Sequence, residues 1–132
     1  MARENTRLDR RRRGAAAELL AARYLRARGL RVLGRNLRCR GGEIDLLCRE
    51  EEILVVVEVR MRGRTTRGND FGGALASVSA AKRRRLLWAT RWLLARHPAL
   101  CRWRLRFDVI GIERTAGSEL TLTWVRDAFR AT

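Results

Sequence analysis

The stretch of residues 41–62 constrains the fold more than any other part of the chain, because it contains two apolar runs separated by four charged residues. The first run covers residues 44–48, and the second, residues 53–59, is rich in β-branched side chains. Short apolar runs on either side of a charged turn predict a β-hairpin. Both strands are apolar enough to be covered on two faces, so we expect the hairpin to lie within a sheet that has helices packed on it.

Acidic side chains are expected to gather on one face of this hairpin. With the turn centred on residues 50–51, Glu43 lies opposite Glu58. The alternation of side chains along a strand adds Asp45 and Arg60 to the same face. Opposed carboxylates repel one another, and a buried carboxylate needs a compensating cation. The pattern therefore indicates a divalent metal ion, with an ordinary solvated face as the alternative.

The overall charge indicates a polyanionic partner. The 132 residues include 30 Lys and Arg against 14 Asp and Glu, which gives a net charge of +16. A field of this sign attracts nucleic acid before any other partner. No membrane partner is expected, because no helix separates basic residues from bulky apolar anchors and no run is long enough to cross a bilayer.

The cysteines indicate a reducing compartment. Cys39, Cys48 and Cys101 are odd in number and show no Cys-x-x-Cys spacing, so we expect reduced thiols rather than a zinc site or disulfides. The charged N-terminal segment lacks the apolar core of a secretory signal. Together these features predict a cytoplasmic protein.

The order of the predicted elements indicates one α/β domain. We expect a flexible basic arm over residues 1–13 and a single domain over residues 14–132. Apolar spacing and caps predict, in order, a helix over about residues 10–28, strands over 30–37, 44–48 and 53–59, a helix from Ser77 or Ser79 to about 96, and strands over 103–112 and 119–125. This α-β-β-β-α-β-β order predicts a central mixed five-stranded sheet flanked by helices.

Several residues outside the hairpin are candidates for the same site. Glu18 lies beside the apolar stripe of the first helix, so it is either a boundary residue paired with an arginine or an acid directed at the acidic face. Trp88 and Trp92 have the helical spacing of core positions, and we expect them in the core or an interface. The basic residues expected to contact nucleic-acid phosphates are Arg38, Arg40, Arg62, Arg64, Lys82 and Arg83.

Five short motifs follow one another along the chain: Ala17-Glu18, Gly42-Glu43-Ile44-Asp45, Glu58-Val59-Arg60, the basic helix start at Lys82, and Arg106-Phe107-Asp108-Val109-Ile110. In this order and spacing they resemble the YraN family of small bacterial proteins. That family belongs to the restriction-endonuclease-like superfamily and is similar to archaeal Holliday-junction resolvases. The resemblance covers roughly residues 14–112 and implies the restriction-endonuclease-like form of the α/β fold.

The resemblance implies a metal-dependent nuclease site of the PD-(D/E)xK type. In such a site Asp45, Glu58 and the carbonyl of Val59 would hold Mg²⁺ or Mn²⁺, and Glu18 matches the acid that approaches the metal from the first helix. The accessory candidates are Glu43 and Asp108. The implied activity is an endonuclease on branched or structured DNA, and because resolvases cut two strands symmetrically, a homodimer is also implied.

Arg60 departs from the pattern, because the family and its superfamily place a lysine there. A guanidinium stays protonated and cannot act as a general base, although it still neutralises phosphate charge. Lys82, the only lysine, could reach the site from the second helix and take over the missing role. Three functions stay open: an endonuclease, a catalytically silent nucleic-acid-binding module, and a basic protein bound to ribosomal RNA or an acidic partner. DNA is favoured over RNA as the nucleic acid.

Overall fold

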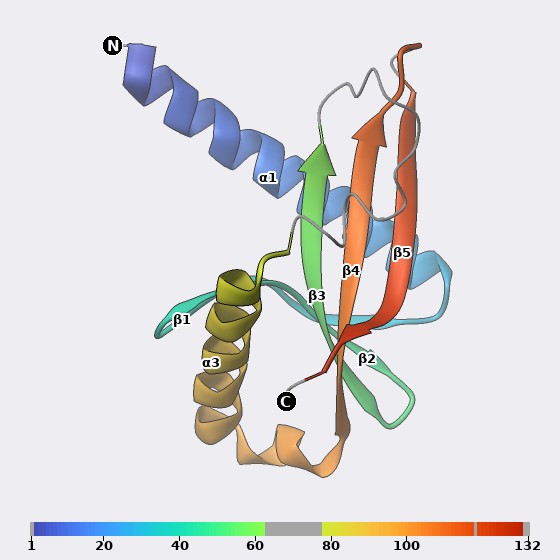
Figure 1. Cartoon of the computed structure of the whole chain (residues 1–132). Coiled ribbons are helices and arrows are strands. Elements are labelled where there is room, and N and C mark those ends of the chain that lie inside the picture. The colour runs from blue at the N-terminus through green and yellow to red at the C-terminus, as the bar shows by residue number, and fades with distance from the viewer. Residues whose placement is uncertain (1, 63–77, 118, 131–132) are drawn as a thin grey trace.

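The computed structural model describes the backbone of residues 2–62, 78–117 and 119–130, and the side chains of residues 14–61, 78–117 and 119–130. Within these ranges the chain forms two α-helices, a short 3-10 helix and five strands (Figure 1). The predicted order α-β-β-β-α-β-β is confirmed. The elements are α1 Ala2–Ala27, β1 Arg31–Cys39, β2 Gly42–Glu50, β3 Ile53–Arg62, α3 Ala80–Arg96, η1 Pro98–Arg102, β4 Arg104–Arg114 and β5 Leu120–Phe129.

The five strands form one mixed sheet, as predicted, in the spatial order β1-β2-β3-β4-β5. Strands β3 and β4 are parallel, and the other neighbours are antiparallel. A parallel pair needs a long crossover, and α3 with η1 lies between β3 and β4 in the chain. The crossover therefore brings α3 across one face of the sheet (Figure 1).

The two helices cover opposite faces of the sheet, so each face has its own apolar core (Figure 1). On the α1 face Leu25 packs with Val57, and on the α3 face Leu86 packs with Val56. The alternation along β3 continues to Glu58, which therefore points to the α3 side. None of the described helices has the length and apolar character needed to cross a membrane.

Helix α1 begins at Ala2, earlier than the predicted start near residue 10. The expected flexible arm over residues 1–13 is therefore helical from Ala2 onward, and its side chains lie outside the described residues. The extension has a local reason, because no Gly or Pro precedes Gly14 and most of these residues are good helix formers. At the other end Gly29, with φ of 93°, follows the helix as expected for a C-terminal cap.

The turn between β2 and β3 consists of residues 51–52, so its centre lies one residue later than the predicted centre at residues 50–51. The strands therefore pair two residues away from the predicted register, and the predicted opposition of Glu43 and Glu58 is wrong. The two-residue turn that forms is the commonest hairpin connection. Because a shift of two residues preserves the faces of a strand, Asp45 and Glu58 still lie on the same side.

Strands β2 and β3 separate at the end of the hairpin that is remote from its turn. Their pairing ends at Leu46 and Val57, beyond which β2 stays paired with β1 and β3 stays paired with β4. We call this divergence the fork, and define it by residues 42–45 of β2 and 58–61 of β3. The fork is where the acidic motifs of both strands lie.

Candidate functional site

The fork places a carboxylate where the ladder of backbone hydrogen bonds stops. Beyond the Leu46–Val57 pair, the amide of Val59 donates to Oδ2 of Asp45 over 2.9 Å. A backbone amide away from water needs such an acceptor. The divergence of the strands therefore holds the Asp45 side chain between them.

Glu58 is the buried centre of the site, with only 3% of the residue exposed. Nζ of Lys82 lies 2.8 Å from its Oε1, whereas NH1 of Arg60 lies 3.9 Å from the same oxygen. The arginine on β3 is thus the more distant cation. Lys82, which reaches in from α3, forms the close ion pair with the carboxylate.

Three carboxylates share this region. Burial, followed by the charge of Glu58, raises the pKa of Asp45 to about 8. Burial also raises the pKa of Glu18, with a hydrogen bond to Asp45 opposing the rise and the charge of Glu43 adding to it. Near neutral pH a proton therefore stays on Asp45, where its neighbouring carboxylates can accept a hydrogen bond from it.

A pocket of about 250 Å³ opens over the carboxylates. Gly42 lies against α3, since a Cβ at this position would be 3.4 Å from the carbonyl oxygen of Arg85, which is an ordinary van der Waals contact. One wall is acidic and the wall formed by α3 is basic, an arrangement that suits a cation on one side and a phosphate on the other. The lining residues are Gly42, Glu43, Asp45, Glu58, Lys82, Arg85 and Leu86.

The N-terminal cap of α3 positions Lys82. Oγ of Ser79 accepts a hydrogen bond from the Lys82 amide over 3.2 Å, which confirms Ser79 as the cap. Leu86, one turn later, is buried against the sheet, so Lys82 lies on the same face of the helix. No acidic residue occupies the first turn, and the positive end of the helix dipole therefore adds to the charge of Lys82.

Other predicted residues lie at the rim of the pocket or beyond it. Glu43 lines the rim, and Oε1 of Glu43 lies 3.8 Å from Nε of Arg38, with both side chains exposed. Arg40 is exposed in the turn between β1 and β2. Arg64 and the side chain of Arg62 lie outside the described residues.

Arg83 lies next to Lys82 in the chain but faces another part of the molecule. Its guanidinium is 5.1 Å from the ring centroid of Phe129, and it lines a groove between α3 and the end of β5. Consecutive side chains on a helix point about 100° apart. The structure therefore does not bring Arg83 together with the carboxylates of the fork.

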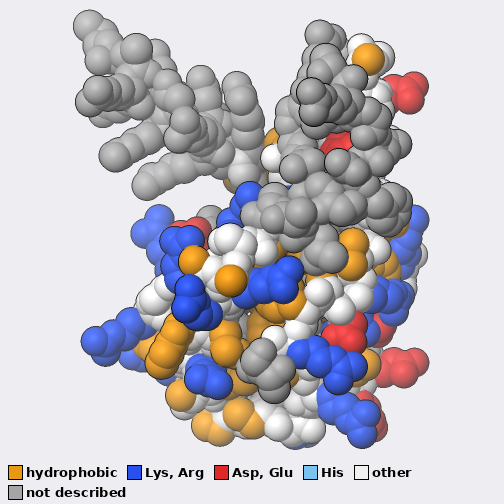
Figure 2. Space-filling view, viewed as in Figure 1, with side chains coloured by type: hydrophobic (Ala, Val, Ile, Leu, Met, Phe, Trp, Pro, Cys, Tyr) orange, Lys and Arg blue, Asp and Glu red, His pale blue; other side chains and the backbone are white. Residues whose placement is uncertain are grey.

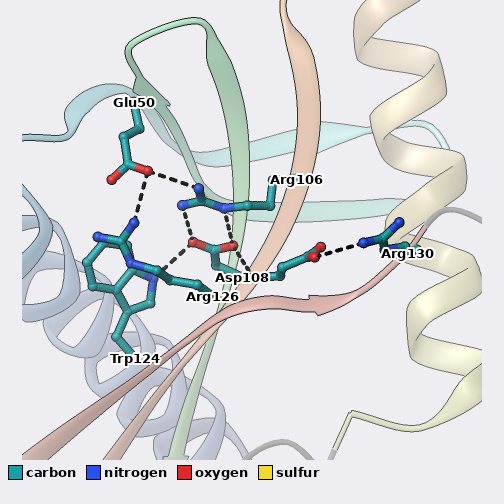
Figure 3. Close-up of polar contacts among 7 residues, drawn as sticks. Glu50, Arg106, Asp108, Trp124, Arg126 and Arg130 are labelled. Carbon is teal, nitrogen blue, oxygen red and sulfur yellow. Dashed lines mark hydrogen bonds and ion pairs between the residues drawn. The ribbon is translucent and has the colours of Figure 1, made fainter.

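Asp108 lies on the α1 side of the sheet, because the β4 residues two and four positions later belong to that core. Its carboxylate accepts two hydrogen bonds from Arg106, at 2.8 and 2.9 Å, and one each from the Trp124 indole and the Asp127 amide, both at 2.9 Å (Figure 3). Arg106 also contacts Glu50 over 2.9 Å. Asp108 therefore joins β4, β5 and the hairpin tip, and it does not reach the fork.

Two residues of α3 were not predicted from the sequence to lie beside the pocket. Arg85 lines the pocket one turn after Lys82, a spacing that could have identified it. Trp88 was expected in the core or an interface but is 61% exposed. The positions of α3 that face the sheet are filled by Leu86 and Ala89, so the indole lies on the outer flank.

The donor set of the fork fits a hard divalent cation. Asp45 and Glu58 offer carboxylate oxygens, and Mg²⁺ is commonly bound by one or two carboxylates together with water. Within the described part of the chain, no group of three or more acidic, His or Cys side chains forms a ligand set, so the fit depends on these two residues. The convergence of the Asp45 and Glu58 carboxylates in one pocket is the observation that favours a cation here.

The protein is an α/β protein with one mixed sheet. Its hairpin opens into a fork, where an acidic pocket faces a basic helix. The model of the "Uncharacterised protein family UPF0102" matches residues 17–112. The chain belongs to this family, which is the YraN family that its motifs resemble.

Several relatives of this family cover most of the chain. A UPF0102 protein of Xanthomonas campestris pv. campestris (strain B100) is 46% identical over 121 residues, which is 92% of this chain and 93% of the relative. One of Dechloromonas aromatica (strain RCB) is 48% identical over 120 residues, 90% of this chain and 89% of the relative. One of Alcanivorax borkumensis is 43% identical over 116 residues, 88% of this chain and 90% of the relative.

Proposed function

We propose that this protein binds nucleic acid and hydrolyses a phosphodiester bond at the fork with the help of Mg²⁺ or Mn²⁺. The observation that carries the proposal is the convergence of Asp45 and Glu58 on one pocket, with Lys82 2.8 Å from Glu58. Two carboxylates that share a pocket away from water attract a cation, and burial and the charge of Glu58 already disfavour the charged form of Asp45. The basic wall of the same pocket is suited to the phosphate.

Five residues in and around the fork have a role in this proposal. Asp45 and Glu58 would hold the ion, which when bound supplies activation of water and neutralisation of phosphate charge. The ammonium of Lys82 donates hydrogen bonds that orient the attacking water beside Glu58. The guanidinium of Arg60 stabilises negative charge on the phosphate. Glu18 increases the negative potential around Asp45 from the side of α1.

The surface charge supports a nucleic acid as the substrate. The chain has a net charge of +16, and Lys and Arg side chains outnumber acidic ones over the described part of the face in Figure 2. Arg38, Arg40 and Arg85 lie exposed on the elements around the pocket, where they can contact the backbone on both sides of the bound phosphate. Branched or structured DNA is the proposed substrate class, with cleavage by a homodimer.

The test is a cleavage screen with purified protein on four-way junctions, flaps, single strands, duplexes and RNA, with Mg²⁺ or Mn²⁺. We expect Asp45→Asn and Glu58→Gln each to reduce cleavage by about 100-fold or more. Glu43→Gln is the matched control, because Glu43 is an exposed acid at the rim of the same pocket, and it should retain activity within about 3-fold. Equal activity of the wild type and the Asp45→Asn variant would exclude the fork as the active site.

Metal binding can be measured without any substrate. Because burial and Glu58 raise the pKa of Asp45 to about 8, binding of Mg²⁺ at pH 7 should displace a proton. Calorimetric titrations in buffers with different ionisation enthalpies should then give different heats. A heat that does not depend on the buffer would contradict the role of Asp45 as a ligand.

A catalytically silent nucleic-acid-binding module is the second candidate. It is favoured by the Lys82–Glu58 contact of 2.8 Å, because the ammonium group already neutralises the carboxylate, and by the presence of Arg60 on β3. This candidate predicts binding that weakens with salt but is indifferent to Mg²⁺. The Arg60→Lys variant separates the two candidates, because gain of cleavage in this variant alone would show a site that Arg60 keeps inactive.

A further inference from the structure

Trp88 exposes more of its surface than the other exposed large apolar side chains in the described part of the chain. It is 61% exposed, whereas Leu33, Met61 and Leu120 are between 37% and 45% exposed. An indole has a large apolar surface whose contact with water is unfavourable, and exposed aromatic rings are typical of binding sites. The ring is therefore accessible to a ligand.

The ring lies next to the pocket of the fork. On α3, Lys82 and Arg85 line the pocket, and Trp88 follows Arg85 by three residues, so it is the next side chain on that flank of the helix. Gly41, in the turn between β1 and β2, lies on the other side, since a Cβ there would be 3.6 Å from Cβ of Trp88. Trp88 therefore continues the basic wall of the pocket outward.

Cationic groups surround the ring. The guanidinium of Arg91 lies 5.8 Å from its centroid, and Arg84 and Arg85 are exposed neighbours one turn before it. Arg40 is exposed in the adjacent turn. A second copy of this chain docked through this surface would bring these arginines close to one another. An aromatic ring among arginines is instead the composition with which proteins bind single-stranded nucleic acid.

We propose that Trp88 stacks on an unpaired base of the nucleic acid whose phosphate occupies the fork pocket. This inference rests on the proposed function and narrows its substrate class to nucleic acids with unpaired bases beside the bound phosphate. In a duplex the faces of the bases are covered by their neighbours, and a ring gains access only by unstacking them. An unpaired base at a branch or in a single strand offers its face without that cost.

The test measures binding by fluorescence anisotropy, without divalent metal, to a single strand, a gapped duplex and a fully paired duplex of equal length. We expect Trp88→Ala to weaken binding of the first two about 10-fold and binding of the duplex less than about 2-fold. Trp88→Phe, which keeps a ring, should bind the single strand within about 3-fold of the wild type. Leu33→Ala, at an exposed apolar residue of β1, is the matched control and should change nothing.

A direct readout uses 2-aminopurine as the unpaired base of the gap. Its fluorescence should fall on binding to the wild type and to Trp88→Phe but not on binding to Trp88→Ala. Equal loss of affinity for all three nucleic acids, or a shift of Trp88→Ala from dimer to monomer in sedimentation, would overturn the inference. If the wild type binds none of the three, the proposed function itself fails; if it binds and Trp88→Ala binds equally well, only the role of Trp88 fails.

Discussion

Buried carboxylates form two clusters on opposite faces of the same sheet, around Asp108 and in the fork. The two clusters differ in how completely hydrogen bonds and cations balance the negative charge. On the α1 side, Asp108 is fully buried and accepts four hydrogen bonds, two of them from Arg106 (Figure 3). On the α3 side, Glu58 is 3% exposed and its close cation is Lys82. Asp45 beside it has a pKa raised to about 8.

The difference separates the carboxylate that holds the fold together from the carboxylates that the proposed function uses. The pKa of Arg106 is raised chiefly by its hydrogen bond with Asp108, so Asp108 stabilises the charged form of the guanidinium. In the fork, burial and the charge of Glu58 instead disfavour the charged form of Asp45. The Asp108 carboxylate, with its four hydrogen bonds, needs no ligand, whereas an added cation would stabilise the carboxylates of the fork, and this contrast supports the proposal that the fork is the functional site.

The largest expected effect is the loss of the hydrogen-bond network around Asp108. Asp108→Ala should lower the free energy of unfolding by about 3–5 kcal/mol, because it leaves the buried part of Arg106 and the Trp124 indole without their acceptor. Urea denaturation measures this change. Asp127→Asn is the control, since the half-exposed Asp127 takes part in the network through its backbone amide, and it should cost less than about 0.5 kcal/mol. Equal losses in the two variants would show that Asp108 is not the centre of the network.

A smaller loss is expected at the ion pair of the fork. Lys82→Met should lower the free energy of unfolding by about 1–2 kcal/mol, because the buried Glu58 carboxylate loses its close cation while part of the Lys82 side chain is solvated. In a Glu58→Gln background the same substitution should cost less than about 0.5 kcal/mol, as a double-mutant cycle would show. Additive losses would mean that the 2.8 Å contact contributes no coupling energy.

Removing the charge of Asp45 should raise the free energy of unfolding, whereas the two preceding substitutions should lower it. Burial and Glu58 raise the pKa of Asp45 from 3.8 to about 8, so between about pH 4 and pH 8 the folded state binds more protons than the unfolded chain. The contribution of Asp45 to the free energy of unfolding therefore falls as pH rises through this window. Without metal at pH 8.5, Asp45→Asn should be more stable than the wild type by about 1–2 kcal/mol.

The control for this prediction is a measurement at pH 4.5, where the variant and the wild type should differ by less than about 0.5 kcal/mol. Addition of Mg²⁺ at pH 8.5 should raise the midpoint of thermal unfolding of the wild type and leave that of Asp45→Asn nearly unchanged. A variant that is less stable than the wild type at pH 8.5 would place Asp45 with Asp108 among the structural carboxylates.

The element order and the acidic face could be predicted from the sequence because both depend on local patterns. Alternation along residues 53–59 and the cap at Ser79 are read from neighbouring residues. Asp45 and Glu58 stay on one face, as predicted, because the one-residue error in the turn centre moves each pairing partner by two residues, which is the period of a strand. A one-residue error in the pairing would have separated them.

What the sequence could not provide depends on contacts between distant segments. The fork exists because β1 and β4 continue to pair with β2 and β3 after these two strands have parted. The role of Asp108 depends on Trp124 and on the Asp127 amide of β5, which local patterns do not bring together. The exposure of Trp88 depends on which flank of α3 the sheet covers, and spacing alone assigned it to the core or an interface.

The smallest expected effect concerns the turn of the β2–β3 hairpin. Glu50, next to this turn, belongs to the hydrogen-bond network around Asp108, and the opposite end of the hairpin forms the fork. Glu51 has φ of 52°, a left-handed conformation that is unfavourable for a side chain of this kind and better tolerated by asparagine. Glu51→Asn should therefore raise the free energy of unfolding by about 0.5 kcal/mol. Glu52→Asn removes the same charge from the same turn and is the matched control, which should change stability by less than about 0.3 kcal/mol.

Because the turn contacts the network of Asp108 and not the fork, Glu51→Asn should leave the proton release on Mg²⁺ binding unchanged. An altered release would show that the two carboxylate groups are coupled through the hairpin, and that the contrast between them is not a property of each group alone.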